Sequence, residues 1–213
     1  MSVSAALELA HLDAHCLVAV KPAGLLAVPG RGEAGTDCLA TRVQAAFGDA
    51  LVVHRLDMAT SGLMLFARGA DAQRRLSQAF AQREVRKRYE AVVHGRVASA
   101  AGEIDLPLRA DWPNRPRQQV DREHGKPSLT RYRVLGFDTL HDTTRLALEP
   151  VTGRAHQLRV HLLAIGHVIL GDALYAPAGL AARAERLLLH ATALRFAHPL
   201  SGAPVQVESA VTF

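Results

Sequence analysis

The sequence predicts an α+β fold, with a mixed, largely antiparallel sheet flanked by helices and loops. Short β-rich runs outnumber helical stretches along the 213 residues, and many follow one another directly, as neighbouring strands of such a sheet do. The composition, with 49% hydrophobic and 21% charged residues, is that of an ordinary folded globule. Nothing in the chain resembles a linker, a repeat or a low-complexity run, so we expect one domain over residues 1–213.

In the first half of the chain, the expected order of elements is strand, helix, two strands and helix. The strand Cys16–Val20 ends at a Lys-Pro-Ala-Gly turn signal. The helix Asp37–Phe47 carries apolar residues four apart on one face, and the strands Leu51–His54 and Leu63–Ala67 surround a short polar loop. The second helix, Asp71–Arg83, places its apolar residues inward and its arginines outward.

In the second half of the chain, strands dominate. One helix is expected from about Ala155 to Ile165, with an apolar stripe of residues three or four apart. The polar segment Asp111–Lys126 carries two prolines and little periodicity, so it is expected to be a functional or mobile loop. The expected strands are Arg88–Val97, Glu103–Leu108, Leu129–Phe137, Thr143–Leu148, Leu187–His190, Ala193–Ala197 and Val205–Val207.

The charge balance favours a polyanionic partner. The 25 Lys and Arg residues exceed the 20 Asp and Glu residues, and most of the cations are arginines, whose planar group suits bidentate phosphate contact. Charge alone leaves the question open, because many basic proteins never bind nucleic acid. Aromatic residues make up only 5% of the chain, which disfavours a sheet of stacking rings; any RNA would be recognised by its shape, its backbone and one extruded base.

Cysteine usage and hydropathy indicate the compartment. The two cysteines, Cys16 and Cys38, form no CxxC pair and no metal-ligand spacing, which suits a reducing cytoplasm. No window reaches the roughly 18 unbroken apolar residues of a membrane span. Because the first basic residue is Lys21, we expect no signal peptide, and we expect a cytoplasmic protein.

The segment Val53–Gly62 is the most informative about chemistry. It places His54, Arg55 and Asp57 within four residues, between two apolar strands. A carboxylate at the end of a buried strand costs free energy unless it is paired or used in a reaction. By spacing alone, the simpler interpretation is a turn whose backbone Asp57 caps.

Two further segments hold polar groups whose spacing alone leaves their role open. In Val151–His161, His156 and Arg159 share a helix face, where a cation could reach a carboxylate on a neighbouring strand or simply face solvent. The two histidines of this segment are five residues apart and do not form the i, i+4 pair typical of a metal site. In Arg86–Gly95, three cations lead into a strand that begins with Tyr89, a residue that by itself indicates packing.

These segments and their order resemble the RluA family of RNA pseudouridine synthases. The marks of that family are HRLD followed by TSGL, a K-x-Y-x-A-x-V-x-G strand, and GRxHQLRVH; here they stand at residues 54–57, 60–63, 87–95 and 153–161. Residues 20–24 and 166–172 also fit, so the resemblance runs from about residue 15 to the C-terminus. Residues 111–116 and 187–190 are similar to members that modify both a tRNA anticodon stem-loop (uridine 32) and a 23S rRNA hairpin (uridine 746).

The resemblance implies isomerisation of uridine to pseudouridine, a reaction that needs no cofactor and no metal. Asp57 is the implied essential carboxylate, acting through a covalent adduct with the ribose or through a glycal. Arg159 is implied to pair with Asp57 and keep its carboxylate ionised. Tyr89 is implied to lie against the target base and is a candidate for transferring the C2′ proton. Arg55 is implied to fill the space that the flipped uridine vacates.

The resemblance also implies the partners, which are tRNA, 23S rRNA or both, with no membrane and no metal, for a protein that acts as a monomer. Many relatives carry an N-terminal S4 RNA-binding domain, for which this chain has no room, so the catalytic domain is expected to make its own RNA contacts. Candidate phosphate contacts are Arg115, Arg117, Arg122 and Lys126, although a solvated surface accounts for them equally well.

Three alternatives remain at this point. A non-catalytic RNA-binding module on the same fold is disfavoured by the joint presence of Asp57, Tyr89 and Arg159. A hydrolase or phosphotransferase with an aspartate nucleophile needs Mg²⁺ and further acidic ligands, and the sequence has no Asp-x-Asp cluster to supply them. A synthase of the same family that modifies a different uridine is the strongest alternative.

Overall fold

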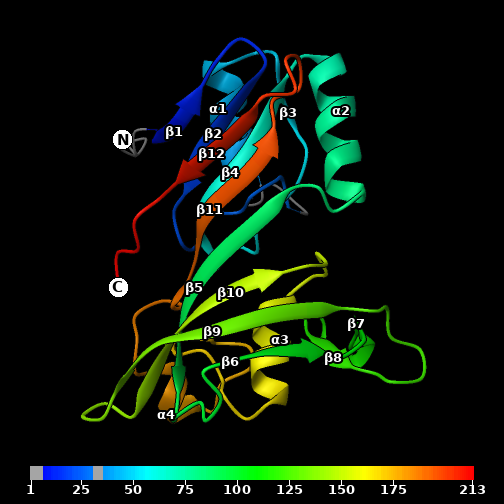
Figure 1. Ribbon diagram of the computed structural model, residues 1–213. Helices are drawn as coiled ribbons and strands as arrows, with labels where there is room; N and C mark the ends of the chain where they lie inside the picture. The colour runs from blue at the N-terminus through cyan, green and yellow to red at the C-terminus, as the bar shows by residue number, and fades with distance from the viewer. Residues whose placement is uncertain (1–6, 31–35) are drawn as a thin grey trace. The chain divides into compact units, whose positions relative to one another are not determined.

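The computed structural model describes residues 7–30 and 36–213, so the expected absence of a signal peptide concerns in part residues 1–6, which lie outside them. The chain divides into two compact units, called here the first unit (residues 1–86 and 191–210) and the second unit (residues 87–190 and 211–213). The boundaries between the units along the chain fall within β5 (Arg86–His94), within β11 (Leu189–Ala197) and after Ala210 (Figure 1). In the described part of the chain, every helix is too short or too polar to cross a bilayer.

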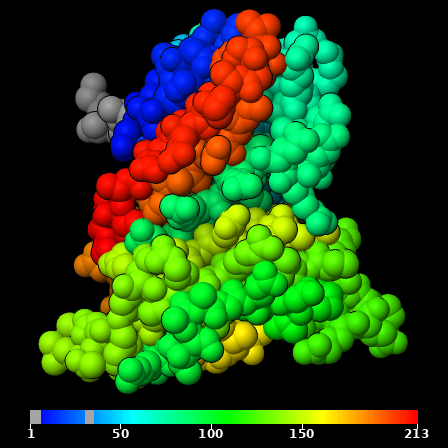
Figure 2. All heavy atoms as spheres, in the orientation of Figure 1, coloured from blue at the N-terminus to red at the C-terminus, as the bar shows by residue number. Residues whose placement is uncertain are grey.

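The strands of the first unit follow the order β1-β2-β4-β11, with β3 beside β4 and β12 beside β11. The pairs β1-β2, β2-β4, β3-β4 and β11-β12 are antiparallel. Figure 2 shows β11 (orange) and β12 (red) lying side by side on the surface of this unit. Two helices accompany the sheet, α1 (Leu39–Ala46) and α2 (Ala70–Ala81). The remaining strands are β1 (Leu9–Leu12), β2 (Cys16–Lys21), β3 (Ala50–Val52), β4 (Ser61–Arg68) and β12 (Pro204–Glu208).

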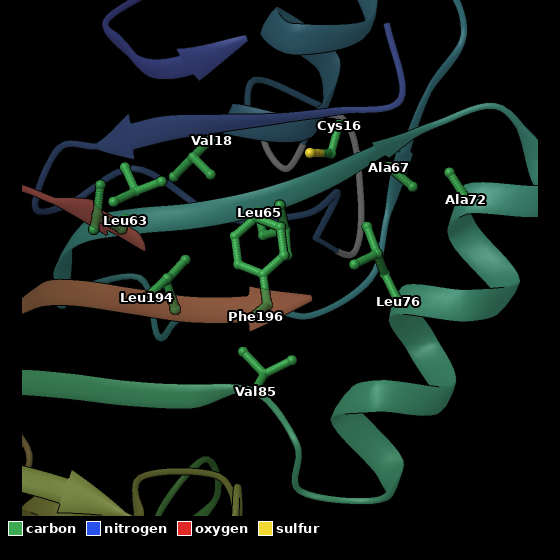
Figure 3. Close-up of a cluster of buried hydrophobic side chains, with 11 residues drawn as sticks. Cys16, Val18, Leu63, Leu65, Ala67, Ala72, Leu76, Val85, Leu194 and Phe196 are labelled. Atoms are coloured by element: carbon green, nitrogen blue, oxygen red, sulfur yellow. The ribbon is translucent and has the colours of Figure 1, made fainter. Parts of the chain in front are cut away.

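The sheet of the first unit is buried on both faces. Successive side chains of a strand point to opposite faces, so Leu63 and Leu65 of β4 join the cluster that includes Leu76 of α2 (Figure 3). Met64 and Phe66 of the same strand join the other cluster, which includes residues of α1. Two buried faces explain why this strand is a continuous apolar run rather than an alternating one.

In the second unit the same sheet, which has ten strands over the described residues, continues with the antiparallel strands β5-β10-β9-β6, and β7 and β8 form a separate two-stranded hairpin. Its helices are α3 (Gln157–Ala164) and the short α4 (Ala178–Ala181), with a single 3₁₀ turn, η2 (Trp112–Asn114), between the hairpin strands. The strands are β6 (Ala101–Asp105), β7 (Leu108–Ala110), β8 (Gln118–Val120), β9 (Leu129–Asp138) and β10 (Thr143–Pro150).

The predicted α+β class and most predicted elements are confirmed, with five differences. Neither the strand β1 nor the short helix α4 was predicted. The strand expected at Glu103–Leu108 is two strands, separated at Pro107, which has no amide hydrogen to donate. The strands expected at Leu187–His190 and Ala193–Ala197 are the single strand β11. The polar segment expected to be a loop is partly folded, since η2 and β8 lie within it.

Candidate active site

The HRLD motif lies in the loop between β3 and β4, and a buried lysine fixes the backbone of that loop. Lys21 is fully buried at the end of β2, and its ammonium donates hydrogen bonds to the carbonyl oxygens of Pro22, Leu25 and Met58 at 2.7–2.9 Å. The amide of Gly24 donates to the same Met58 carbonyl at 2.9 Å. Because Met58 follows Asp57 directly, these bonds hold the backbone on which the carboxylate is carried.

The first residue of the motif, His54, supports the loop. The backbone amide of Leu65 donates to His54 Nε2 at 2.8 Å, so this nitrogen acts as an acceptor and carries no proton. The imidazole also stacks on the ring of Phe80, with centroids 4.5 Å apart. These contacts give His54 an architectural role, because they hold the loop against β4 and α2.

The Thr-Ser-Gly sequence at residues 60–62 lets the backbone at the start of β4 lie very close to the backbone of β11. Gly62 has a φ of +110°, and a Cβ at this position would lie 2.4 Å from the carbonyl oxygen of Ala191. Only glycine accepts both the backbone angle and the close approach. Thr60 closes the preceding turn, its amide donating to the Asp57 carbonyl at 3.1 Å. The glycine of the motif is therefore explained by packing.

The two residues expected to act on RNA in this loop differ in exposure. Asp57 is partly buried, whereas Arg55 and Met58 are exposed. An exposed guanidinium two residues before a partly buried carboxylate can contact RNA without first giving up a protein core contact.

In the second unit, Tyr89 lies on β5 opposite Leu148 of β10 and is 9% exposed. From Tyr89 onward every second residue of this strand is buried. The burial of Tyr89 agrees with the packing interpretation. The expected contact of Tyr89 with the target base stays a prediction.

Arg159 lies on α3 and forms a buried ion pair with Asp172. Its Nε and Nη2 donate to the two carboxylate oxygens at 2.8 and 2.6 Å, and the two side chains are 3% and 0% exposed. Asp172 Oδ1 also accepts the amides of Leu174 and Tyr175 at 3.0 and 3.1 Å. The expected pairing of Arg159 with Asp57 stays a prediction, whereas the alternative of a solvated basic helix face is wrong.

Gly171 allows Asp172 to reach this position. Its φ is +72°, and an added Cβ would lie 1.9 Å from the carbonyl oxygen of Arg186. The Gly-Asp pair at residues 171–172 is thus a close backbone approach followed by the carboxylate that holds Arg159.

Tyr175 contacts several of the polar residues near this ion pair. The guanidinium carbons of Arg117 and Arg159 lie 5.2 and 5.0 Å from its ring centroid. Its hydroxyl accepts the amide of Gln118 at 2.7 Å and lies 2.7 Å from His156 Nδ1. His156 stands in the left-handed conformation just before α3, outside the helix, so the expected shared helix face of His156 and Arg159 is wrong.

The other polar residues of α3 connect the helix to β9. Gln157 Nε2 donates to Leu129 O and Thr130 Oγ1, both at 3.0 Å. His161 is fully buried, with its ring nitrogens 2.9 Å from Thr130 Oγ1 and from Leu106 O. The helix is thus buried nearly all round, and its polar residues are satisfied internally rather than facing solvent.

Buried histidines should make the protein less stable in mild acid. Burial lowers the pKa of His161 below its usual 6.5, and burial together with the charge of Arg186 lowers the pKa of His190. The unfolded chain therefore binds these protons near pH 6.5 while the folded protein does not, so the free energy of unfolding falls as the pH drops below that value. Urea unfolding at pH values from about 7.5 to about 5.5, on either side of the usual histidine pKa of 6.5, measures how the free energy of unfolding changes with pH.

His161→Gln should flatten this pH dependence whatever its effect on stability at neutral pH. His124→Gln changes a histidine whose side chain is 63% exposed and should keep the wild-type slope. An unchanged slope in His161→Gln would contradict the assignment.

The four candidate phosphate contacts lie in or beside the β7-β8 hairpin. Arg115, Arg122 and Lys126 are exposed, and Arg117 is partly buried against Tyr175. Exposure leaves the first three able to meet a phosphate, and their assignment to RNA stays a prediction.

The turn between β1 and β2 gathers side chains that could also ligate a metal, a grouping that sequence spacing did not predict. Ligand atoms of His11, Asp13 and Cys16 lie within 4.8 Å of one another. Asp13 Oδ1 already accepts the amides of His15 and Cys16, and Oδ2 lies 2.8 Å from His11 Nε2. Burial, aided by the charge of Asp13, raises the pKa of the Cys16 thiol to about 12. These contacts stabilise the turn.

The fold and the motif residues define an enzyme class that isomerises uridine in RNA, and a family model of RNA pseudouridylate synthases matches residues 15–164. This chain belongs to the RluA family of RNA pseudouridine synthases. It is 50% identical over 196 residues to the dual-specificity RNA pseudouridine synthase RluA of Escherichia coli K12, covering 92% of this chain and 89% of that protein. The RluA of Yersinia pestis is 49% identical over 203 residues, which cover 95% of this chain and 98% of that protein.

Solved structures of more distant relatives agree with the fold. Human RNA pseudouridylate synthase domain containing 1 superposes with a TM-score of 0.81 at 28% identity, covering 99% of this chain and 86% of that chain. Human RNA pseudouridylate synthase domain containing 4 gives 0.74 at 25% identity, covering 96% and 88%.

Two residues of the site were not predicted. Lys21 stood in a motif that was interpreted as a turn, and Asp172 in a motif for which no role was given. A lysine at the end of a buried apolar strand, and a carboxylate directly after a glycine, were the available signals.

Proposed function

We propose that this synthase modifies one uridine in a tRNA anticodon stem-loop (uridine 32) and one in a 23S rRNA hairpin (uridine 746). The observation that carries the proposal is the 50% identity to the dual-specificity enzyme of E. coli K12 over 92% of this chain. The net charge of +5 supports a polyanionic substrate. We further propose that residues 1–213 act as one catalytic domain and as a monomer in the cytoplasm.

The reaction rearranges atoms that are already present. The N1–C1′ bond breaks, the uracil turns, and a C5–C1′ bond forms, while C5 loses a proton and N1 gains one. No electrons are transferred to or from the RNA, so the proposal includes no cofactor and no metal. Activity should therefore survive excess EDTA.

Asp57 is the proposed catalytic residue. Its carboxylate either adds to C1′ of the ribose or assists a route through a glycal. Both routes need an ionised carboxylate beside a sugar shielded from water, which burial opposes and a nearby cation favours. Arg159 is proposed as that cation, and Tyr89 as the residue that lies against the base and can move the C2′ proton.

Uridine stacked in a stem-loop cannot enter such a site, so it must turn out of the stack at a cost of a few kcal/mol. Arg55 is proposed to enter the vacated space, because a guanidinium can stack and form hydrogen bonds at once. Its exposure in the loop between β3 and β4 supports this role.

The direct test incubates the protein with the two RNA hairpins and maps pseudouridine in each. Modification of both hairpins supports the proposal. Modification of another uridine in total RNA, with both hairpins untouched, assigns the synthase to a different target. Tight binding without any pseudouridine would overturn the catalytic assignment and favour an RNA-binding module.

RNA binding should weaken steeply with salt. If Arg55 and the exposed cations of the β7-β8 region meet phosphates, each contact releases counterions, and the dissociation constant should rise more than about ten-fold between roughly 50 and 200 mM salt. Filter binding with either hairpin measures this slope. Arg122→Gln should reduce the slope of the logarithm of the binding constant against the logarithm of salt concentration by about one, the value of one phosphate contact, for every RNA tested. A flat response to salt would remove these cations from the RNA interface.

A further inference from the structure

Trp112 is the one tryptophan of the chain, and 61% of it is exposed. It lies in η2, the 3₁₀ turn between β7 and β8 of the second unit. A large exposed aromatic ring contributes little to a hydrophobic core, and such residues commonly mark a binding surface. The fold itself therefore gives no reason for an indole at this position.

The indole is held in place from one side. The guanidinium carbon of Arg115 lies 3.2 Å from the ring centroid. A cation stacked on one face restrains the ring and covers that face, so any partner must approach the remaining surface of the indole.

The turn that carries Trp112 is closed by its own hydrogen bonds. The amide of Asp111 donates to Arg117 O, and the amide of Arg117 donates to Asn114 O, both at 3.0 Å. Asn114 Nδ2 donates to both carboxylate oxygens of Asp111, at 3.0 and 3.1 Å. A preorganised turn loses little conformational entropy when it binds a partner.

The charge around the indole favours a polyanion. Over residues 109–126 there are five Lys and Arg residues and three Asp and Glu residues. All three carboxylates have partners within this segment: Asp111 accepts from Asn114, Asp121 accepts from Arg109 at 3.0 Å, and Glu123 lies 3.8 Å from His124 Nδ1. Exposed cations beside an exposed aromatic ring match a nucleic acid, whose phosphates and base faces alternate along the strand.

We propose that Trp112 is a stacking platform for an unpaired base of the substrate RNA, a base other than the uridine that is modified. Arg115 supports the indole from behind, and neighbouring cations contact the phosphates. The hairpin loop of an RNA offers several unpaired bases that can stack on such a ring. This inference rests on the proposed RNA substrate and adds a contact that reads the single-stranded character of the loop.

Intrinsic fluorescence tests the contact directly, because all tryptophan emission comes from this one residue. Titration with the anticodon stem-loop should quench the emission and protect the indole from acrylamide. A fully paired RNA duplex of the same length is the control and should leave most of the emission unchanged. Equal responses to loop and duplex, or no response to either, would overturn the proposal.

Substitution provides the second readout. Trp112→Ala should raise KM for the stem-loop about ten-fold and leave kcat within about two-fold, since base stacking contributes affinity rather than chemistry. Trp112→Phe should keep most of the affinity. Leu140→Ala, at an 85% exposed apolar residue of the same unit, is the matched control and should leave both constants unchanged.

The two proposals fail in distinguishable ways. If the wild-type protein forms no pseudouridine in any RNA, the proposed function fails. If it forms pseudouridine but Trp112→Ala leaves KM unchanged, or lowers kcat alone, the platform is refuted and the proposed function stands.

Discussion

Asp57→Asn should abolish pseudouridine formation, lowering kcat/KM by at least about 10³-fold, because the amide keeps the shape of the side chain and loses its charge and its nucleophilicity. The backbone around Asp57 is held by Lys21 and Gly24 through the Met58 carbonyl, so the loop should keep its conformation in the variant. RNA affinity should stay within a few fold. Tritium release from RNA labelled at C5 of uridine measures the reaction, since C5 loses its hydrogen as the new bond forms.

The control for this variant is Met58→Leu. Met58 is the next residue and is 53% exposed, but only its backbone carbonyl takes part in the loop contacts described above. This substitution should leave the rate nearly unchanged. Turnover retained in Asp57→Asn would refute the role of Asp57, and a parallel loss of RNA binding would show that the substitution had disturbed the loop instead.

Asp172→Asn should lower the free energy of unfolding by about 3–5 kcal/mol, because it removes the carboxylate that pairs with a buried guanidinium. Both oxygens of Asp172 accept hydrogen bonds from Arg159, and the two side chains are 0% and 3% exposed. Since Arg159 is proposed to keep Asp57 ionised, the rate measured under conditions where the variant is folded should also fall. Urea denaturation measures the stability, and single-turnover kinetics measures the rate.

An exposed ion pair of the same unit is the control. Glu103→Gln removes the partner of Arg131, in a pair whose side chains are both more than half exposed, and should change the stability little. Arg159→Lys keeps the charge but loses the two-pronged contact with Asp172, so the protein should still fold while much of the rate is lost. Full activity in Arg159→Lys would remove Arg159 from the catalytic machinery.

Sequence patterns predicted most helices and strands, because these elements depend on side chains only a few residues apart. The continuous apolar run Leu63–Ala67 predicted a buried strand, and four-residue spacing predicted the apolar face of the helix after Asp37. The polar segment 111–126 was predicted less well. Its strand β8 forms by pairing with β7, and such pairing depends on a partner elsewhere in the chain rather than on the periodicity of the segment itself.

The sequence likewise predicted part of the candidate site and missed part of it. Asp57, Arg55, Tyr89 and Arg159 were named from short motifs, and the family they indicate is the family to which the chain belongs. Their catalytic and RNA-binding roles stay predictions. The helix carrying Arg159 was expected to have a polar face, but its polar residues are buried, because Gln157 and His161 find partners on β9 and in the chain around Leu106.

The residue order alone therefore determined the fold class, the order of most elements and the motifs that mark a pseudouridine synthase. Tertiary structure alone decided that Asp172 holds Arg159, that Lys21 fixes the loop of Asp57, and that Gly62 and Gly171 permit close backbone contacts. The physical reason is distance along the chain. Periodicity and motifs reflect neighbours a few residues apart, whereas a buried charge is stabilised by whichever partner the folded chain brings within hydrogen-bond reach.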